Sequence, residues 1–337
     1  MMAGKVTSAE VALRAGVSRS AVSRVFTPGA SVSAKTAQKV RTAASDLGYR
    51  PNVLARSLMT GRSRIIGLVV AYLDNLFYPT ALELLSNALQ AQGYHVMVFM
   101  ASQTAGNIDD VLAEILDYQV DGLVVASVAM SSELTSRCRA SGVPVVLFNR
   151  GQDDARQASV TTDNYAGGHA VANYLVATGH HRIGHVAGWA GASTARDREA
   201  GFADGLAAAG QEIFAREVGD FHDERARSAA RAMFTPAERP DAVFVANDHM
   251  AFLVMDVLRS ELGLSVPGDV SVVGFDDVPT AAWGAYDLTT VRQPLARMVD
   301  ETTRMLLAQI ESPDTAPRHV LLPAELVIRG SSRARGQ

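Results

Sequence analysis

Four side chains that can donate hydrogen bonds lie close together near the N-terminus: Arg19, Ser20, Ser23 and Arg24. Ser18 precedes them and can cap a helix, because its hydroxyl can accept a hydrogen bond from an amide of the first turn. The intervening positions are small or apolar, so this helix would have one buried face and one face of donors. An arginine on such a face can donate to both O6 and N7 of a guanine, which is worth about 1–3 kcal/mol of discrimination. This chemistry suits the edges of base pairs in duplex DNA.

A second group of chemistry-bearing residues follows the apolar runs of the chain. Pairs of polar or aromatic residues come directly after several of these runs: Asp74-Asn75 and Phe77-Tyr78, Asn149-Arg150, Asn247-Asp248, and Asp276-Asp277. Ligands of open parallel sheets bind beyond the carboxyl ends of the strands. The pattern therefore predicts a small-molecule site built from these strand ends.

The elements that present the N-terminal donors are predicted to be two short helices joined by a tight turn. Thr7 and Glu10 have the spacing of a capping box, which begins the first helix. Gly16 suits the left-handed conformation that ends it. Ser18 then begins a second helix that we expect to reach about Phe26. This is the helix-turn-helix pattern, in which the second helix enters the major groove.

A third helix is predicted from Ser33, which caps it, to Gly48, which ends it. Its apolar residues recur at helical spacing, at Ala37, Val40, Ala44 and Leu47. A generic three-helix bundle with a solvated basic face is the alternative interpretation. The density of basic residues on the second helix favours DNA binding.

Charge is divided unevenly along the chain. Residues 1–64 contain 11 Lys or Arg against Glu10 and Asp46, a net charge of +9. The whole chain has a net charge of −4, so residues 65–337 carry −13. A packed core does not require such a division, whereas phosphate neutralisation on duplex DNA does.

Length and composition predict about two soluble domains, since the chain has 337 residues with 48% hydrophobic and 20% charged. Cys138 is the single cysteine, which excludes an intramolecular disulfide and a thiolate metal cluster. Neither a secretory signal nor a membrane-spanning apolar stretch is visible, so we expect a cytoplasmic protein with no membrane partner. We predict no metal and no cofactor.

The remainder of the chain alternates apolar runs with amphipathic segments. Two amphipathic helices are expected, at 81–92 and 249–261. Such alternation predicts parallel sheets covered by helices on both faces. The runs are Ile65–Val70, His95–Met100, Gly122–Ala126, Val143–Phe148, Ile183–Ala187, Ala242–Val245 and Val270–Val273.

The chain resembles the LacI/GalR family of bacterial transcription factors over about residues 5–330. In the N-terminal part the motifs are Ala15-Gly16-Val17-Ser18, Val22-Ser23-Arg24-Val25, Val32-Ser33-Ala34-Lys35-Thr36 and Leu47-Gly48-Tyr49-Arg50-Pro51-Asn52. Further along they include Gly179-His180-His181-Arg182-Ile183, Val245-Ala246-Asn247-Asp248, Val273-Gly274-Phe275-Asp276-Asp277 and Leu288-Thr289-Thr290-Val291-Arg292-Gln293-Pro294. The resemblance implies an α/β fold, with a three-helix helix-turn-helix head and a periplasmic-binding-protein-like core of two Rossmann-like subdomains.

By this resemblance the DNA-binding residues are in the head and in a hinge helix. Residues 51–61 match the hinge, and Leu58 matches the residue that wedges into the minor groove and kinks the duplex. A flexible tether is the alternative for this segment. The implied DNA-binding set is Thr7, Ser18, Arg19, Ser20, Ser23, Arg24, Asn52, Ala55 and Leu58.

The resemblance also implies an effector site in the cleft between the subdomains. Its residues are Asp74, Phe77, Tyr78, Arg150, Arg198, Phe221, Asn247, Asp276 and Gln293. Aromatic faces of this kind stack on sugar rings, while the planar polar groups pair with adjacent hydroxyls. A neutral pentose or hexose is the first expectation, and the two arginines also permit an acidic or phosphorylated sugar.

The implied protein is a homodimeric repressor that binds double-stranded operator DNA under the control of a small effector. No leucine-heptad tail follows Gly330, so we do not expect a coiled-coil tetramer. The predicted domains are a head at 1–50, a hinge or linker at 51–61 and a core at 62–337. The core would divide into one subdomain of 62–162 plus about 292–325 and another of 163–291 plus the C-terminal end.

Other interpretations of individual motifs are weaker. Asp276-Asp277 could form a general acid–base pair, but adjacent residues diverge at a strand end. His180, His181 and His185 suggest a metal site, although solvated loop residues are the commoner case. Gly184, Gly188 and Gly191 lack the Gly-Lys-Ser/Thr ending of a phosphate loop and fit a loop that faces the cleft.

Two rival classes apply to the whole chain. A transport-type sugar-binding protein would share the core but would not need residues 1–61. A nucleotide-sugar enzyme should carry a glycine fingerprint after its first strand, which residues 65–74 lack.

Overall fold

The computed structural model describes residues 6–27, 29–50, 62–101, 108–126, 136–138, 140–151 and 157–333. The chain forms two compact units, Met1–Arg64 and Ile65–Gln337. Each unit has hydrophobic clusters of its own.

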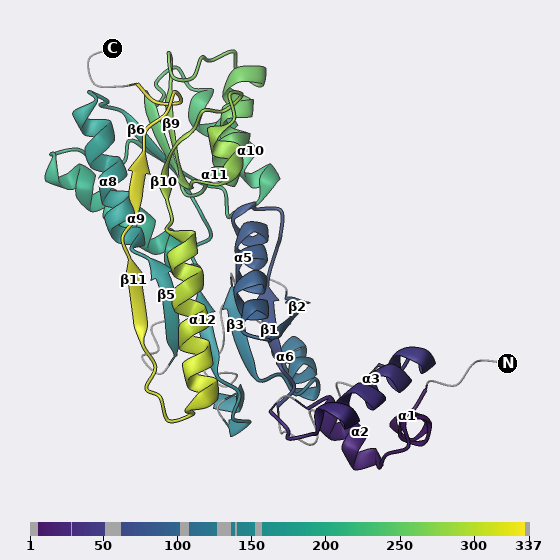
Figure 1. The fold of residues 1–337 in the computed structure, drawn as a ribbon. Helices are drawn as coiled ribbons and strands as arrows, with labels where there is room; N and C mark the ends of the chain where they lie inside the picture. The colour runs from purple at the N-terminus through teal and green to yellow at the C-terminus, as the bar shows by residue number, and fades with distance from the viewer. Residues whose placement is uncertain are drawn as a thin grey trace. The chain divides into compact units, whose positions relative to one another are not determined.

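The first unit contains the helices α1 (Ser8–Ala15), α2 (Arg19–Val25) and α3 (Ala34–Leu47), shown in purple in Figure 1. Its small core contains six buried residues: Val11, Ala12, Val22, Val40, Ala43 and Ala44. The predicted inward residues Ala21 and Val25 of α2 are only half-buried. The helix-turn-helix arrangement is therefore held by very few fully buried side chains.

The ends of these helices are set by local hydrogen bonds. Thr7 and Glu10 form the reciprocal capping box, with the amide of Thr7 donating to Glu10 Oε2 at 2.7 Å. The Ser18 hydroxyl accepts from the amide of Ala21 at 3.2 Å. Gly16 and Gly48 end α1 and α3 with φ of 66°, in the region that glycine adopts without strain. The predicted caps of the three helices are confirmed.

The second unit contains two sheets (Figure 1). The first has the strand order β11-β5-β4-β3-β1-β2, and all its pairings are parallel. Its strands are β1 (Ile65–Val70), β2 (His95–Met100), β3 (Gly122–Ala126), β4 (Val145–Phe148), β5 (Ala158–Thr162) and β11 (His319–Leu322). The C-terminal strand β11 thus joins a sheet that is otherwise built from residues 65–162.

The second sheet has the order β12-β10-β9-β8-β6-β7. Its strands are parallel except that β12 runs antiparallel to β10. They are β6 (Ile183–Ala187), β7 (Ala215–Val218), β8 (Ala242–Val245), β9 (Ser271–Asp276), β10 (Thr289–Arg292) and β12 (Glu325–Val327).

Helices cover both faces of each sheet, which explains why the central strands are continuous apolar runs. In the first sheet, Ile66 and Leu68 face a cluster with α5 (Phe77–Ala91) and α12 (Leu295–Glu311). Val69 faces the opposite cluster with α6 (Ile108–Asp117).

In the second sheet, α8 (Asn164–Ala177) and α9 (Ser193–Ala208) cover one face. The other face is covered by α10 (Asp223–Phe234) and α11 (Asp248–Asp256), which continues as a π-helical turn to Glu261. Among the described residues, no helix is long and apolar enough to cross a membrane.

The structure corrects several sequence predictions. The helix expected at 81–92 begins at Phe77, because Pro79 is tolerated in a first turn that needs no amide donor there. The run expected from Val143 is a strand only from Val145. Strands β5, β7, β10, β11 and β12 were absent from the predicted set, since they are short or lie near sheet edges and lack continuous apolar runs.

The interpretation of His180 and His185 as solvated loop residues is wrong. Both are fully buried, and His185 lies within β6 with its Nδ1 2.9 Å from the carbonyl oxygen of Phe244. His180 Nε2 lies 2.9 Å from the hydroxyl of Ser271. Burial lowers the pKa of His185 to about 4, so this imidazole is neutral at physiological pH.

Candidate functional site

The head presents polar side chains on one helix. Arg19, Ser20 and Arg24 on α2 are exposed, and Ser23 is half-buried. Arg24 Nε donates to the carbonyl oxygen of Ser20 at 3.4 Å, so this guanidinium lies back along the helix. Arg19 forms no such contact among the described residues, and its fork is available for a base or a phosphate.

Two of the predicted DNA-binding residues also have local roles. The Ser18 hydroxyl caps α2 and lies 2.9 Å from the hydroxyl of Ser20. Thr7 is exposed and its hydroxyl donates to Glu10 Oε2 at 2.9 Å. The predicted contacts of Asn52, Ala55 and Leu58 lie outside the described residues.

The centre of the core site is a buried ion pair. Arg198 on α9 and Asp276 at the end of β9 are 2% and 6% exposed, with Nη2 and Oδ1 3.2 Å apart. Arg198 also donates to Asn164 Oδ1 at 2.8 Å and to the carbonyl oxygen of Ala246 at 2.6 Å. Its guanidinium carbon lies 3.6 Å from the centre of the Phe275 ring. The charge of Arg198 is therefore balanced within the protein, and each of its three nitrogens donates one hydrogen bond, which leaves two of its five N–H donors for an effector.

Hydrogen bonds connect Asp276 to residues of both sheets. Gln293, which follows β10, donates to Asp276 Oδ1 at 2.7 Å and accepts from the hydroxyl of Thr162 on β5 at 2.7 Å. Burial raises the pKa of Asp276, while Arg198 opposes the rise. The side chain of Asn75, which follows β1, also lowers the pKa of Asp276. This carboxylate links the two subdomains at the base of the cleft.

Aromatic residues of the first-sheet subdomain form a cluster. Phe77 and Tyr78 lie in the first turn of α5, with ring centres 5.4 Å apart in an edge-to-face arrangement. Tyr78 contacts Tyr72 in the same manner at 5.2 Å, and Phe77 stacks on Phe148 at 6.3 Å. Both predicted aromatic residues are buried, Phe77 deep among other rings.

Arg150 lies in the cleft without the partners that Arg198 has. It is 4% exposed, and its guanidinium carbon is 5.6 Å from the centre of the Trp189 ring. Its Nε and Nη1 are buried and have no hydrogen-bond partner. The neighbouring Asn149 donates to the Tyr78 hydroxyl at 3.4 Å, while its Oδ1 is also buried without a partner.

Trp189 was missed as a site residue by the sequence prediction. It follows β6, so the strand-end argument applied to other residues would have found it. The glycines of this loop make room for the aromatic residues of the cleft. A Cβ at Gly188 would overlap the Phe221 ring, and one at Gly191 would overlap the Trp189 ring.

An outer cavity of about 520 Å³ is lined by Asp74, Trp189, Asp220 to Asp223 and Arg225. The predicted residues Asp74 and Phe221 are thus near Trp189. Asp74, Asp223 and His249 each place a ligand-type atom within 4.8 Å of the others. A hydrogen bond of 2.7 Å between His249 Nε2 and Asp223 Oδ1 accounts for part of this closeness.

The remaining aspartates and Asn247 have structural partners. Asn247 Oδ1 accepts from the amide of Met250 at 3.0 Å and caps α11, so only its NH₂ group remains to contact an effector. Asp277 is bonded to Arg292 and Arg329 at 2.6 Å each. The side chains of Asp276 and Asp277 have separate partners, which agrees with the argument against an acid–base pair.

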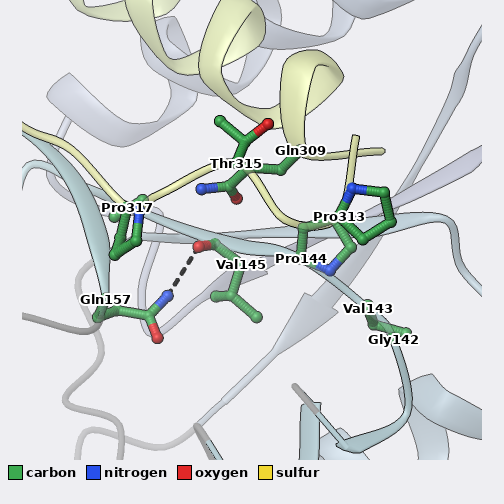
Figure 2. Close-up of a pocket in the computed structure, with 10 residues that line it drawn as sticks. Gly142, Val143, Pro144, Val145, Gln157, Gln309, Pro313, Thr315 and Pro317 are labelled. Atoms are coloured by element: carbon green, nitrogen blue, oxygen red, sulfur yellow. Dashed lines mark hydrogen bonds between the residues drawn. The ribbon is translucent and has the colours of Figure 1, made fainter. Parts of the chain in front are cut away.

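A further cavity of about 140 Å³ lies between the start of β4 and the segment after α12 (Figure 2). Gln157 donates to the carbonyl oxygen of Val145 at its wall, at 2.7 Å. Its lining contains two side-chain amides and one hydroxyl, that of Thr315, among apolar residues and glycine, and no charged residue. The buried polar side chains Arg198, Asp276 and Arg150, together with the outer cavity beside Trp189, are the better candidate for a polar effector.

Comparison with known proteins identifies the family of both units. Residues 7–52 match the profile described as bacterial regulatory proteins, lacI family, and residues 172–332 match a periplasmic binding protein-like domain. The transcriptional regulator CelR of Thermobifida fusca is 34% identical over 331 residues, covering 95% of this chain and 96% of that protein. The chain belongs to the LacI family. It is a DNA-binding transcriptional regulator controlled by an effector, and it is not an enzyme.

Other LacI-family relatives extend over the same length. The repressor PurR of Photobacterium profundum is 30% identical, covering 96% of this chain and 98% of that protein. The structure of the lac repressor dimer bound to operator and the anti-inducer ONPF has a TM-score of 0.88, with 28% identity over 98% of this chain and 100% of that one. A CelR–cellobiose complex has a TM-score of 0.73 and 30% identity over 97% of this chain and 100% of that one. The predicted fold class, with its helix-turn-helix head and periplasmic-binding-like core, is confirmed.

Proposed function

We propose that this regulator is a homodimeric cytoplasmic repressor that releases or retains a pseudo-palindromic operator according to a sugar bound in the cleft. The observation that carries the sugar is the buried set of Arg198, Asp276 and Gln293 beside the aromatic residues Tyr78 and Trp189. Planar donors and acceptors next to ring faces are the chemistry that sugar hydroxyls and C–H surfaces require. The complex of CelR with cellobiose supports this class of effector.

The contacts across the cleft suggest how effector binding is transmitted. Thr162, on the first sheet, bonds to Gln293, which bonds to Asp276 on the second sheet. The amide of Gly151 donates to the hydroxyl of Ser193 at 3.2 Å, which is another contact between the two subdomains. A ligand that engages Gln293 and Asp276 changes the relative stability of the open and closed cleft, and that difference is what shifts the equilibrium.

We propose that the dimer forms through the subdomain of the first sheet. Leu76, Val98 and Met100 are apolar side chains between 41% and 51% exposed, at the start of α5 and on the edge strand β2. The lac repressor, whose structure is similar, is a dimer on its operator. Two heads would then read two half-sites, one in each of two successive major grooves.

Selection of binding sites from a random duplex pool tests the operator assignment. We expect the full chain to enrich an inverted repeat, and a cognate sugar to change its affinity for that site. Arg19→Ala should lower the affinity for the selected site more than that for random duplex, by about 1–3 kcal/mol, if Arg19 reads a guanine. Fluorescence anisotropy with both duplexes measures this difference.

Arg14→Ala is the matched control, since Arg14 is an exposed head arginine on α1 that pairs with Asp46 at 3.8 Å. It should affect both duplexes equally. An equal loss on both duplexes for Arg19→Ala would show that Arg19 contacts only phosphate. Enrichment of no repeat at all would contradict the operator proposal itself.

A further inference from the structure

We propose that the effector carries an anionic group, a carboxylate or a phosphate, and that Arg150 binds it. This inference rests on the proposed sugar effector and specifies its chemical class. The single feature that motivates it is the contrast between the two buried arginines of the cleft.

Arg198 shows what a satisfied arginine requires at this depth. Its guanidinium has the Asp276 carboxylate, the Asn164 side-chain oxygen and the Ala246 carbonyl oxygen as partners. Its positive charge is balanced by Asp276. An effector needs to add no charge there.

Arg150 is buried to the same degree but lacks both kinds of partner. Nε and Nη1 are shielded from solvent with no acceptor. Among the residues that the structure describes, no aspartate or glutamate forms an ion pair with it. Trp189 offers only a ring face. Arginine keeps its charge at any physiological pH. Within the described part of the chain, burial therefore leaves the charge of Arg150 without an ion-pair partner and at least two of its donors unused.

The nearby acidic groups are engaged elsewhere. Asp276 is bonded to Arg198 and Gln293. Asp74 lies with Asp223 and His249 at the outer cavity. Asp248 is fully buried, and burial raises its pKa to about 8, so it is protonated at neutral pH. None of these carboxylates neutralises Arg150.

The missing partner must supply both charge and geometry. A sugar hydroxyl can accept one hydrogen bond from Arg150 but cannot offset its charge. A carboxylate or phosphate offers two oxygens in the spacing of the guanidinium fork and one or two negative charges. The free Oδ1 of Asn149 beside it can accept from a hydroxyl of the same molecule. An acidic or phosphorylated sugar fits this combination, and a neutral sugar leaves Arg150 unbalanced.

Matched pairs of probes test this inference by isothermal titration of the full chain. The pairs are glucuronate and glucose, galacturonate and galactose, glucose 6-phosphate and glucose, and ribose 5-phosphate and ribose. We expect the anionic member of at least one pair to bind at least about 30-fold more tightly than its neutral partner. The uronate and phosphate arms distinguish the two sources of negative charge.

Two substitutions of Arg150 assign the preference to this residue. Arg150→Gln should remove the preference for the anionic probe, because it should lower the affinity for that probe at least about 10-fold more than the affinity for its neutral partner. Arg150→Lys keeps the charge without the fork and should retain part of the preference. Arg231→Gln is the control, since Arg231 is an exposed arginine of α10 bonded to Glu261 outside the cleft, and it should change neither affinity.

Each result decides the inference. A neutral member that binds as tightly as its anionic partner would overturn the anionic group and leave the sugar proposal intact. Binding of no probe in any pair would overturn the sugar proposal and the inference together. An anionic preference that survives Arg150→Gln would show that another residue holds the group.

Discussion

Asp276 couples the two halves of the core through a single carboxylate. It accepts from Arg198 and from Gln293, and the side-chain oxygen of Gln293 accepts in turn from Thr162 of the other sheet. Removing one partner of a buried ion pair usually costs about 3–5 kcal/mol, because the other charge is left buried and unpaired. Asp276 is therefore both a candidate effector ligand and a structural residue. A substitution there changes stability together with binding.

The protonation state of Asp248 can be tested by measurements of stability alone. Its carboxyl is fully buried, accepts from the amide of Val278 at 3.0 Å and from the Thr290 hydroxyl, and has no cationic partner in the described part of the chain. Burial raises its pKa from 3.8 to about 8. The folded state therefore binds this proton more tightly than the unfolded state does. Its contribution to stability is complete below about pH 4 and is lost as the pH rises toward 8.

Asp248→Asn removes this titration while keeping a group that can bond to both Val278 and Thr290. We expect the free energy of unfolding of the unsubstituted chain to fall relative to that of the variant by up to about 1.4 kcal/mol per pH unit within the window from pH 4 to 8. Urea titrations at pH 5, 6.5 and 8, followed by fluorescence of Trp189 and Trp283, measure this difference. Parallel pH profiles for the two proteins would show that Asp248 is ionised in the folded state.

At the scale of elements, α8 and α9 approach each other through glycines. A Cβ at Gly168 on α8 would overlap the carbonyl oxygen of Arg198 on α9, and one at Gly201 on α9 would overlap the carbonyl oxygen of Tyr165. Both obstacles are backbone atoms, which cannot rotate away as a side chain can. The close approach places the Arg198 side chain over Phe275, where it reaches Asp276.

Gly168→Ala should therefore separate the two helices and displace Arg198. We expect the free energy of unfolding to fall by about 1–3 kcal/mol, as in other overpacked sites. Effector affinity should fall as well, since Arg198 and Asp276 line the cleft. Gly284→Ala is the control, because Gly284 is exposed and a Cβ there meets no atom within 4 Å. Denaturant titration and calorimetry on both variants compare the effects, and equal results would contradict the role given to the glycine contact.

Elements with strong local signals were predictable from the sequence. The head helices follow from Thr7, Ser18 and Ser33 as caps, and the central strands follow from uninterrupted apolar runs. Strands β7 and β11 were not predictable, because each has only four residues with exposed positions among them and pairs with a neighbour distant in sequence. The six-residue edge strand β2 was predicted from its longer apolar run. The site residues show the same limit. A strand-end position identifies Asp276, but only the fold shows that Gln293 joins it to Thr162 of the other sheet.

At the scale of the whole molecule, charge and function are divided in the same way. The head has a net charge of +9 over residues 1–64 and a core of six small side chains. The remaining residues have a net charge of −13 and bury their candidate ligand-binding arginines. Operator affinity therefore depends on salt through the head, because phosphate contacts release counterions. Effector affinity depends instead on buried groups that salt screens only weakly.

Thermodynamic linkage makes a prediction that involves both units. If a sugar in the cleft changes operator affinity by some factor, the operator must change the affinity for that sugar by the same factor, commonly about 5- to 150-fold. Anisotropy with labelled operator at saturating and zero sugar measures one side of this cycle. Calorimetric titration of the sugar into the free protein and into the protein–operator complex, at the same salt concentration, measures the other. Gln293→Ala should reduce both factors toward one together, because Gln293 joins Thr162 of one subdomain to Asp276 of the other. Factors that stay unchanged in a Gln293→Ala variant that binds both ligands would contradict the coupling role given to Gln293.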